Sequence, residues 1–265
     1  MRIPNILSEE VYFPSKPFPF IARFHQSGMW LKISCSAFYH RGMNSLSSNK
    51  PLRSEAIETA ILLAVAGGIV DVITYMERGH VFATAQAGNL VFLAINLTEL
   101  DWKESLRYAL PVLFFMGGVL LTLLFKNRKY KHIYWKQLPL ALEIILISCS
   151  IFLSHRYDYL ANILCNAAAG IQLSTFKYVE GYSIPSTMVA GDIRNGTTDM
   201  LQYAESKDVT KQKSGKLNLI CAACFLGGAI TGNWLQQIFS LKTMWIAVVI
   251  LCIVWVRIGV DKDQI

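Results

Sequence analysis

Two polar steps interrupt otherwise apolar stretches of the sequence: Gly88-Asn89 and Gly191-Asp192. Backbone groups that face lipid without a partner are costly, so an interrupted apolar segment must be buried in protein or line a cavity. Asn and Asp often cap the N-termini of helices. A helix that starts in the middle of a membrane directs its positive end toward that level, where it can face an anionic group. The two steps therefore indicate a ligand site.

A carboxylate accompanies the first step. Asp71 lies inside the first long apolar stretch, where an ionisable side chain is costly and usually functional. It could bind a coupling proton or cation, or it could hold the neighbouring interrupted segment in place. Asp192 could likewise contact a solute or be neutralised by nearby Arg194. Glu143 comes early in its apolar stretch, and we expect it to extend to the inner membrane interface.

Uncharged polar groups complete the candidate set. Gln86 and Thr187 come just before the two steps, and Gln172 lies in another apolar stretch. Such groups bind ligands or join helices to one another. The candidate ligand-binding residues are Asp71, Gln86, Gly88, Asn89, Gln172, Thr187, Gly191 and Asp192.

Several function classes are disfavoured. No Walker, dinucleotide-binding or Ser-His-Asp pattern and no His/Cys ligand set occurs, so we expect no enzyme activity, cofactor or metal. The intramembrane protease signature GxGD is not met, because Val189 stands where its first glycine would be. The net charge is +7, but the Lys and Arg residues lie in short connections rather than on one face, which argues against a nucleic-acid partner.

The elements that must position these residues are membrane helices. With 53% hydrophobic and 16% charged residues, the chain has too few polar groups to cover a soluble globule, and the lipid bilayer is its expected partner. The sequence predicts an all-α polytopic membrane protein with six transmembrane helices and two broken or re-entrant segments, 81–97 and 184–203. The six predicted spans are 56–76, 106–125, 136–154, 158–176, 216–239 and 242–259.

The two halves of the chain share an order of landmarks. Segment 67–94 and segment 169–197 each run from a Gly-Ile pair through an aromatic and charged turn to an Ala-Gly-Asn or Ala-Gly-Asp step. Each is followed by a span with a glycine pair, Gly117-Gly118 or Gly227-Gly228, and by one more span. We therefore predict membrane repeats at 56–154 and 155–260. Flanking them are an N-terminal cytosolic tail at 1–55, whose start before Met43 could be misassigned, and a C-terminal tail at 261–265.

Charge counting predicts the orientation. If both interrupted segments dip in and return, fifteen Lys or Arg residues from Lys50 onward lie inside and five outside. Full crossing, with eight spans, would give eleven inside and eight outside, with Arg194 left in the middle of the membrane. The positive-inside rule favours the first model, with both termini cytoplasmic. Three spans per half then make the repeats inverted.

The chain from about 56 to 258 also resembles the YoaK family of bacterial inner-membrane proteins, a domain of unknown function. The matching stretches are AGGIVDVITYMERGHVFATAQAGNLVFLA, AAGIQLSTFKYVEGYSIPSTMVAGDIRNGT and the Gly-pair span. The family's breaks usually read Thr-Gly-Asn, and its Gln-Asn pair is here Gln172-Leu173. Ala87 and Ala190 lack the threonine hydroxyl, which puts any ligand role of that group in doubt. The resemblance implies the architecture and an inner-membrane location, but no substrate.

These features predict a small-solute transporter or permease, with anions among the candidate solutes and a site at the membrane midplane between the repeats. The alternative is a membrane assembly or regulatory protein that transports nothing.

Overall fold

The computed structural model describes residues 52–126, 134–185 and 187–260. The predicted C-terminal tail, most of the N-terminal tail with Met43, and the loop 127–133 lie outside these residues. All of the described residues belong to the compact unit that begins at Ser47.

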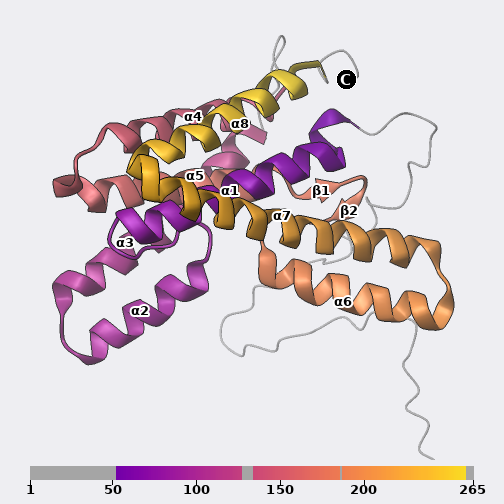
Figure 1. Ribbon diagram of the computed structural model, residues 1–265, viewed down its shortest axis with the longest axis horizontal. Coiled ribbons are helices and arrows are strands. Elements are labelled where there is room, and N and C mark those ends of the chain that lie inside the picture. Colours follow the sequence, from indigo (N-terminus) through magenta and orange to yellow (C-terminus); the bar gives the residue numbers. More distant parts are fainter. Residues whose placement is uncertain (1–51, 127–133, 186, 261–265) are drawn as a thin grey trace, which may run out of the picture. The chain divides into compact units, whose positions relative to one another are not determined.

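The described chain is almost entirely helical (Figure 1). The first half contains α1 (Ile57–Glu77), α2 (Gln86–Thr98), α3 (Trp102–Lys126) and α4 (Gln137–Phe152). The second half contains α5 (Asp158–Thr175), α6 (Val189–Ser206), α7 (Val209–Phe239) and α8 (Met244–Ile258). The short elements are the 3-10 helices η2 (Arg53–Glu55), η3 (His155–Tyr157) and η4 (Ser240–Thr243), and a hairpin of β1 (Tyr178–Val179) with β2 (Tyr182–Ser183).

Helices occupy all six stretches predicted to span the membrane. Among the described residues, three helical segments are long and apolar enough to cross a bilayer: α1, α3, and the segment from α7 through α8, Val209–Ile258. Helix α4 is apolar but shorter. Large apolar side chains on α3 and α7, such as Leu120, Leu124 and Ile230, are exposed on the outer faces, as expected of surfaces that contact lipid.

The main helix pairs join the two halves. Helix α1 packs along α7, and α5 packs along α3, while α2 lies on α3 and α6 lies on α7 (Figure 1). The first two pairs approach closely at glycines. A methyl group at Gly68 would overlap the carbonyl oxygen of Phe225, and one at Gly170 would overlap the carbonyl oxygen of Phe115. Small residues at such crossings let helices in lipid gain dispersion contacts.

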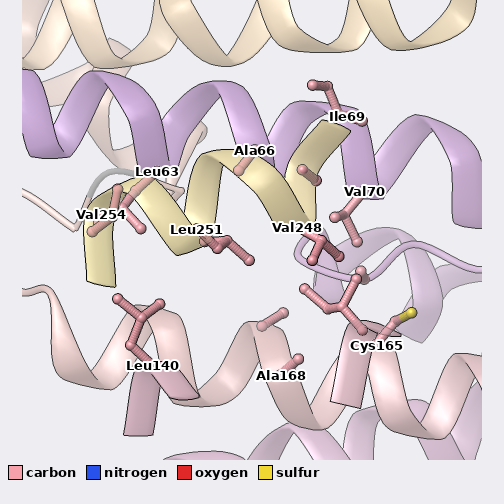
Figure 2. Packing of buried hydrophobic residues seen from close by; sticks show 14 of the residues in the cluster. Leu63, Ala66, Ile69, Val70, Leu140, Cys165, Ala168, Val248, Leu251 and Val254 are labelled. Carbon is pink, nitrogen blue, oxygen red and sulfur yellow. The ribbon is translucent and has the colours of Figure 1, made fainter. Parts of the chain in front are cut away.

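The apolar core lies where α1, α4, α5 and α8 meet. Figure 2 shows Leu63 and Ala66 of α1, Leu251 of α8, and Leu140 and Ala168 of α4 and α5 among the packed side chains. All five are at most 1% exposed. This cluster holds α4 and α8 to the helices that carry the candidate site.

Candidate functional site

Asp71 is bonded to the loop that precedes α2. Its Oδ1 accepts a hydrogen bond from the Thr84 backbone N–H at 2.6 Å, and its Oδ2 accepts one from the Thr84 hydroxyl at 2.7 Å. The carboxyl group is buried on α1. These hydrogen bonds are the contacts that the orienting role predicts, because they hold the start of the interrupted segment against the first helix.

A short polar chain continues from this loop to α5. The Gln86 side-chain amide donates to the Asn166 Oδ1 at 2.8 Å, and the Asn89 amide donates to the Gln86 Oε1 at 3.3 Å. We call Asp71, Thr84, Gln86, Asn89 and Asn166 the polar cluster. It links α1, α2 and α5, and three of its members were candidate site residues from the sequence.

The expectation that Asn89 caps a helix is wrong. Helix α2 begins at Gln86, so Asn89 is its fourth residue, and no side-chain hydrogen bond caps its N-terminus. Instead the Asn89 Oδ1 accepts from the Phe82 N–H at 2.9 Å, and its amide donates to the Phe82 carbonyl at 2.8 Å. A side-chain amide offers both a donor and an acceptor, so Asn89 closes the loop 82–89 by pairing with both backbone groups of one residue.

Asp192 occupies the same position in α6, and it is no cap either. Helix α6 begins at Val189, which makes Asp192 its fourth residue. The residue seven positions earlier, equivalent to Phe82, is Pro185, which has no N–H to donate. Asp192 is 1% exposed, and both carboxyl oxygens lack a hydrogen-bond partner within the described chain. The exposed Arg194 therefore does not neutralise it, contrary to that alternative.

The second interrupted segment contacts α1 one turn from the first. The Thr187 methyl group lies 2.7 Å from where a β-carbon would be on Gly67. Gly67 and Asp71 are four residues apart on α1, which places them on one helix face with about 6 Å between them along the axis. Thr84 and Thr187 thus bring the two breaks to neighbouring points on the same helix.

The remaining candidates have packing or bridging roles. The Gln172 amide donates to the Leu63 carbonyl at 3.1 Å and so joins α5 to α1. A methyl group at Gly88 would come 2.9 Å from the Phe82 ring, whereas Gly191 faces only Met188. Asp192 lies against α7, within electrostatic range of the Cys221 thiol, and within the described residues its carboxyl group makes no hydrogen bond to the polar cluster.

Both Asp71 oxygens and the side chains of Gln86 and Asn89 make hydrogen bonds within the polar cluster. A hollow of about 260 Å³ lies between α3, α4 and α5, and its lining is apolar. None of the candidate residues lines it. Within the described residues, no group of three or more His, Cys, Asp or Glu side chains gathers where a metal could be held.

Sequence reasoning missed one buried arginine. Arg78 was counted as a loop charge, but it is 1% exposed and donates to the carbonyls of Ser150, Leu153 and Ser154 at the end of α4. It also pairs with Asp158 at 2.7 Å. Asn162 in turn donates to the Arg78 carbonyl at 2.6 Å. Arg78 therefore ties the end of α1 to α4 and α5, directly beside the first loop.

Glu143 was also placed wrongly. It does not extend to an interface: its side chain is 0% exposed and both carboxyl oxygens lack a partner in the described residues. No hydropathy pattern distinguishes a carboxyl that turns inward from one that reaches the membrane surface, because both lie in the same apolar stretch.

Known proteins give the family of this chain. Residues 59–256 match a family described as a protein of unknown function, DUF1275. The chain is 24% identical over 199 residues to the UPF0700 transmembrane protein YoaK of Bacillus subtilis (strain 168), an alignment that covers 72% of this chain and 88% of that protein. No solved structure matches it. The match to YoaK and the apolar helices agree with the resemblance read from the sequence, and the chain is a transmembrane member of the DUF1275 family.

Proposed function

We propose that this protein is a small-solute permease built from two inverted repeats, with its site where the two breaks meet. In this proposal α1, α3, α4, α5, α7 and α8 span the membrane, and α2 and α6 return to the side from which their loops enter. The repeats are 56–154 and 155–260. The protein lies in a bacterial inner membrane with both termini in the cytoplasm.

Equivalent glycine contacts support the repeat. Gly68 approaches Phe225 and Ala229, while Gly170 approaches Phe115 and Val119. Gly170 of α5 lies 102 positions after Gly68 of α1, and the contacted residues of α7 lie 110 positions after those of α3.

The glycines of α7 and α3 contact α1 and α5 with the same two offsets in residue number. Gly228 approaches Val65, and Gly118 approaches Ala167. In each half the first helix therefore packs on the third helix of the other half through the same positions, which is the pattern expected of two interlocked, related units.

The length of α2 supports re-entry. It has 13 residues, or about 20 Å of helix, whereas the hydrocarbon core is about 30 Å thick. Its first residues lie beside Asp71 through Thr84, within α1 rather than at an end of it. A loop that descends to this level and a helix of this length return to the side of entry.

One observation carries the functional proposal: Thr84 is bonded to Asp71 and Thr187 packs on Gly67, one turn away on the same face of α1. Discontinuous segments from inverted repeats that meet inside the membrane are how many secondary transporters form a solute site. Thr84 bonds both oxygens of Asp71 here, so a solute would reach the Asp71 carboxyl group when the loop that carries Thr84 moves away. Asp71 could then bind a coupling proton or cation, or an entering solute.

A ligand screen tests the proposal. Purified protein in lipid nanodiscs is heated with a panel of small anions, cations and neutral metabolites, since a bound solute raises the unfolding temperature by mass action. Each compound that stabilises wild type is then tested for uptake into proteoliposomes containing wild type, Asp71→Asn or Thr231→Ala. Thr231 is exposed on α7, and its hydroxyl donates to the Gly227 carbonyl of the same helix, so its variant is the matched control.

We expect uptake by wild type and Thr231→Ala, and reduced or pH-independent uptake by Asp71→Asn. Binding without uptake in any of the three would favour the regulatory alternative. Equal uptake with equal pH dependence in all three would remove Asp71 from the mechanism.

A further inference from the structure

An unpartnered carboxyl group is enclosed in the apolar core, on a helix that contributes nothing to the polar cluster. Glu143 of α4 is 0% exposed, and both its oxygens lack a hydrogen-bond partner in the described part of the chain. It lies three residues after Leu140 and four before Ile147, and helix residues at these spacings share a face. Both neighbours belong to the core cluster that includes Leu251 and Val254 of α8 (Figure 2).

Within the described residues, no positively charged side chain lies close enough to Glu143 to offset a negative charge on its carboxyl group. Helix α8 carries only Cys252 and Arg257 as titratable groups. Cys252 is exposed, and Arg257 pairs with Glu58 near the end of the helix.

The other helices packed against α4 include α5 and α3, and the core around Glu143 also contains α1. The titratable groups of α1 are Glu58, Asp71, Tyr75 and Glu77. Glu58 pairs with Arg257, Asp71 is bonded to Thr84, and Tyr75 and Glu77 lie in the last turn of the helix.

The titratable groups of α5 are Asp158, Tyr159 and Cys165. Asp158 is bound to Arg78. Cys165 is bonded to Ser150, which lies two turns after Glu143 on α4. The titratable groups of α3 lie toward its ends: Lys103, Glu104, Arg107, Tyr108 and Lys126.

On the chain of α4 itself, Lys136 precedes the helix and pairs with Glu55 at 3.3 Å. The helix also carries Cys149, which is exposed.

We propose that Glu143 is a membrane-buried proton-binding site, whose carboxyl group holds its proton in the structure described here. An ionised carboxylate without a partner in such surroundings is far more costly than the neutral acid. The site takes its proton from water and returns it to water when the Glu143 carboxyl group becomes hydrated. This inference does not depend on whether a solute is transported.

The structure also indicates what controls access to the site. Helices α4 and α8 run antiparallel and are fastened on both sides of Glu143. On one side the Trp255 indole N–H donates to the Gln137 carbonyl at 3.1 Å, and the Gln137 amide donates to the Trp255 carbonyl at 3.3 Å. On the other side the Ser150 hydroxyl lies 3.5 Å from the Met244 sulfur. Separation of these helices would let water reach Glu143, and the hydrogen-bonded pair of Gln137 and Trp255, here called the latch, opposes that separation.

Infrared spectroscopy of the protein in nanodiscs tests the protonation state, because a protonated carboxylic acid and a carboxylate absorb in separate regions. At neutral pH we expect the spectrum of wild type minus Glu143→Gln to contain the band of one protonated acid. Glu143→Met is a second variant that should lose the same band, and Asp192→Asn should retain it.

Wild type alone can overturn the proposal, whatever the variants do. A wild-type spectrum at neutral pH without a protonated-acid band would refute it. So would a difference spectrum in which the lost group is a carboxylate, which would mean that Glu143 binds a cation instead.

The latch is tested by transfer into D₂O, where exchange of the acid proton shifts the same band. Trp255→Phe removes the indole donor and should make exchange roughly fivefold faster, because a lost hydrogen bond makes opening more frequent. Trp245→Phe is the control at the far end of α8, where the ring packs edge-on against Phe152. Equal exchange rates in wild type and Trp255→Phe would refute the latch.

Discussion

Adjacent glycines in each half should respond oppositely to the same substitution. Gly118 faces α5: a methyl group there would overlap the Ala167 carbonyl oxygen and lie 3.1 Å from the Ile171 nitrogen. Gly117, the preceding residue, has nothing within 4 Å of that position. In the second half, Gly228 faces Val65 of α1 and Gly227 faces open space.

The magnitude depends on which atoms can move. The obstructing atoms at Gly118 and Gly228 belong to helix backbone, so they cannot yield as a flexible side chain would, and the two helices must separate. Overpacking of this kind typically costs about 1–3 kcal/mol, and a gap of about 0.5–1 Å along the crossing loses a quarter to a half of the dispersion attraction there. At Gly117 and Gly227 alanine meets no obstacle and is the better helix former by about 0.8–1 kcal/mol.

The assay is the free energy of unfolding in mixed micelles for the four single variants. We expect Gly118→Ala and Gly228→Ala to be destabilised by about 1–3 kcal/mol, and Gly117→Ala and Gly227→Ala to be unchanged or slightly more stable. Equal effects within each adjacent pair would refute the proposed helix crossings. A large effect in only one half would contradict the equivalence of the repeats.

Three further perturbations concern individual contacts. Arg78→Met leaves Asp158 and three carbonyls at the end of α4 without their donor. The free energy of unfolding, measured in the same micelles, should therefore fall by about 3–5 kcal/mol. A fall below about 1 kcal/mol would mean that Arg78 is not buried. Asp71→Asn and Thr84→Val remove opposite sides of one contact, so the double variant should be less destabilised than the sum of the two, with a coupling energy of about 0.5–3 kcal/mol, and strict additivity would show that the contact is absent. Hydrogen bonds from the Thr210 hydroxyl and N–H lower the pKa of Asp208, which caps α7 outside the membrane. Because the folded-state pKa is depressed, the stability contributed by the ionised Asp208 cap is present above the unfolded pKa and is lost as the pH falls through the folded-state pKa. Asp208→Asn can still accept the cap bond but does not titrate, so it should remove this part of the acid dependence of the melting temperature. An unchanged dependence of the melting temperature on pH would contradict the assignment.

The fold class and the positions of the helices were predictable from the sequence, since runs of apolar residues determine where helices lie in lipid. The two breaks were also visible, because Gly-Asn and Gly-Asp are rare within such runs. The start of each helix was not. Asn89 and Asp192 are good caps in general, but three residues before each of them already adopt helical geometry. Asn89 closes its loop through Phe82 instead, a choice that depends on where the loop folds back.

The surroundings of the charged residues could not be read from the sequence. Arg78 beside Gly79 looks like an ordinary loop charge, and only the fold reveals that the end of α4 lies against it. Glu143 and Asp71 are both acids in apolar stretches, yet one has no partner among the described residues and the other holds Thr84. Partners that lie 80 or more residues away in the chain, such as Asn166 for Gln86, leave no local pattern.

The most direct test of the inverted repeats is the side from which four positions can be labelled. Single cysteines at His80, Thr98, Ser183 and Ser206, in a chain whose own cysteines are replaced by serine, are exposed to a membrane-impermeant maleimide in intact cells and in inverted vesicles. His80 and Thr98 flank α2 with its loop, and Ser183 and Ser206 flank α6 with its loop. We expect His80 and Thr98 to react only in intact cells, and Ser183 and Ser206 only in inverted vesicles. Reaction of His80 and Thr98 from opposite sides would show that α2 crosses the membrane, and reaction of all four from one side would show that the repeats are not inverted.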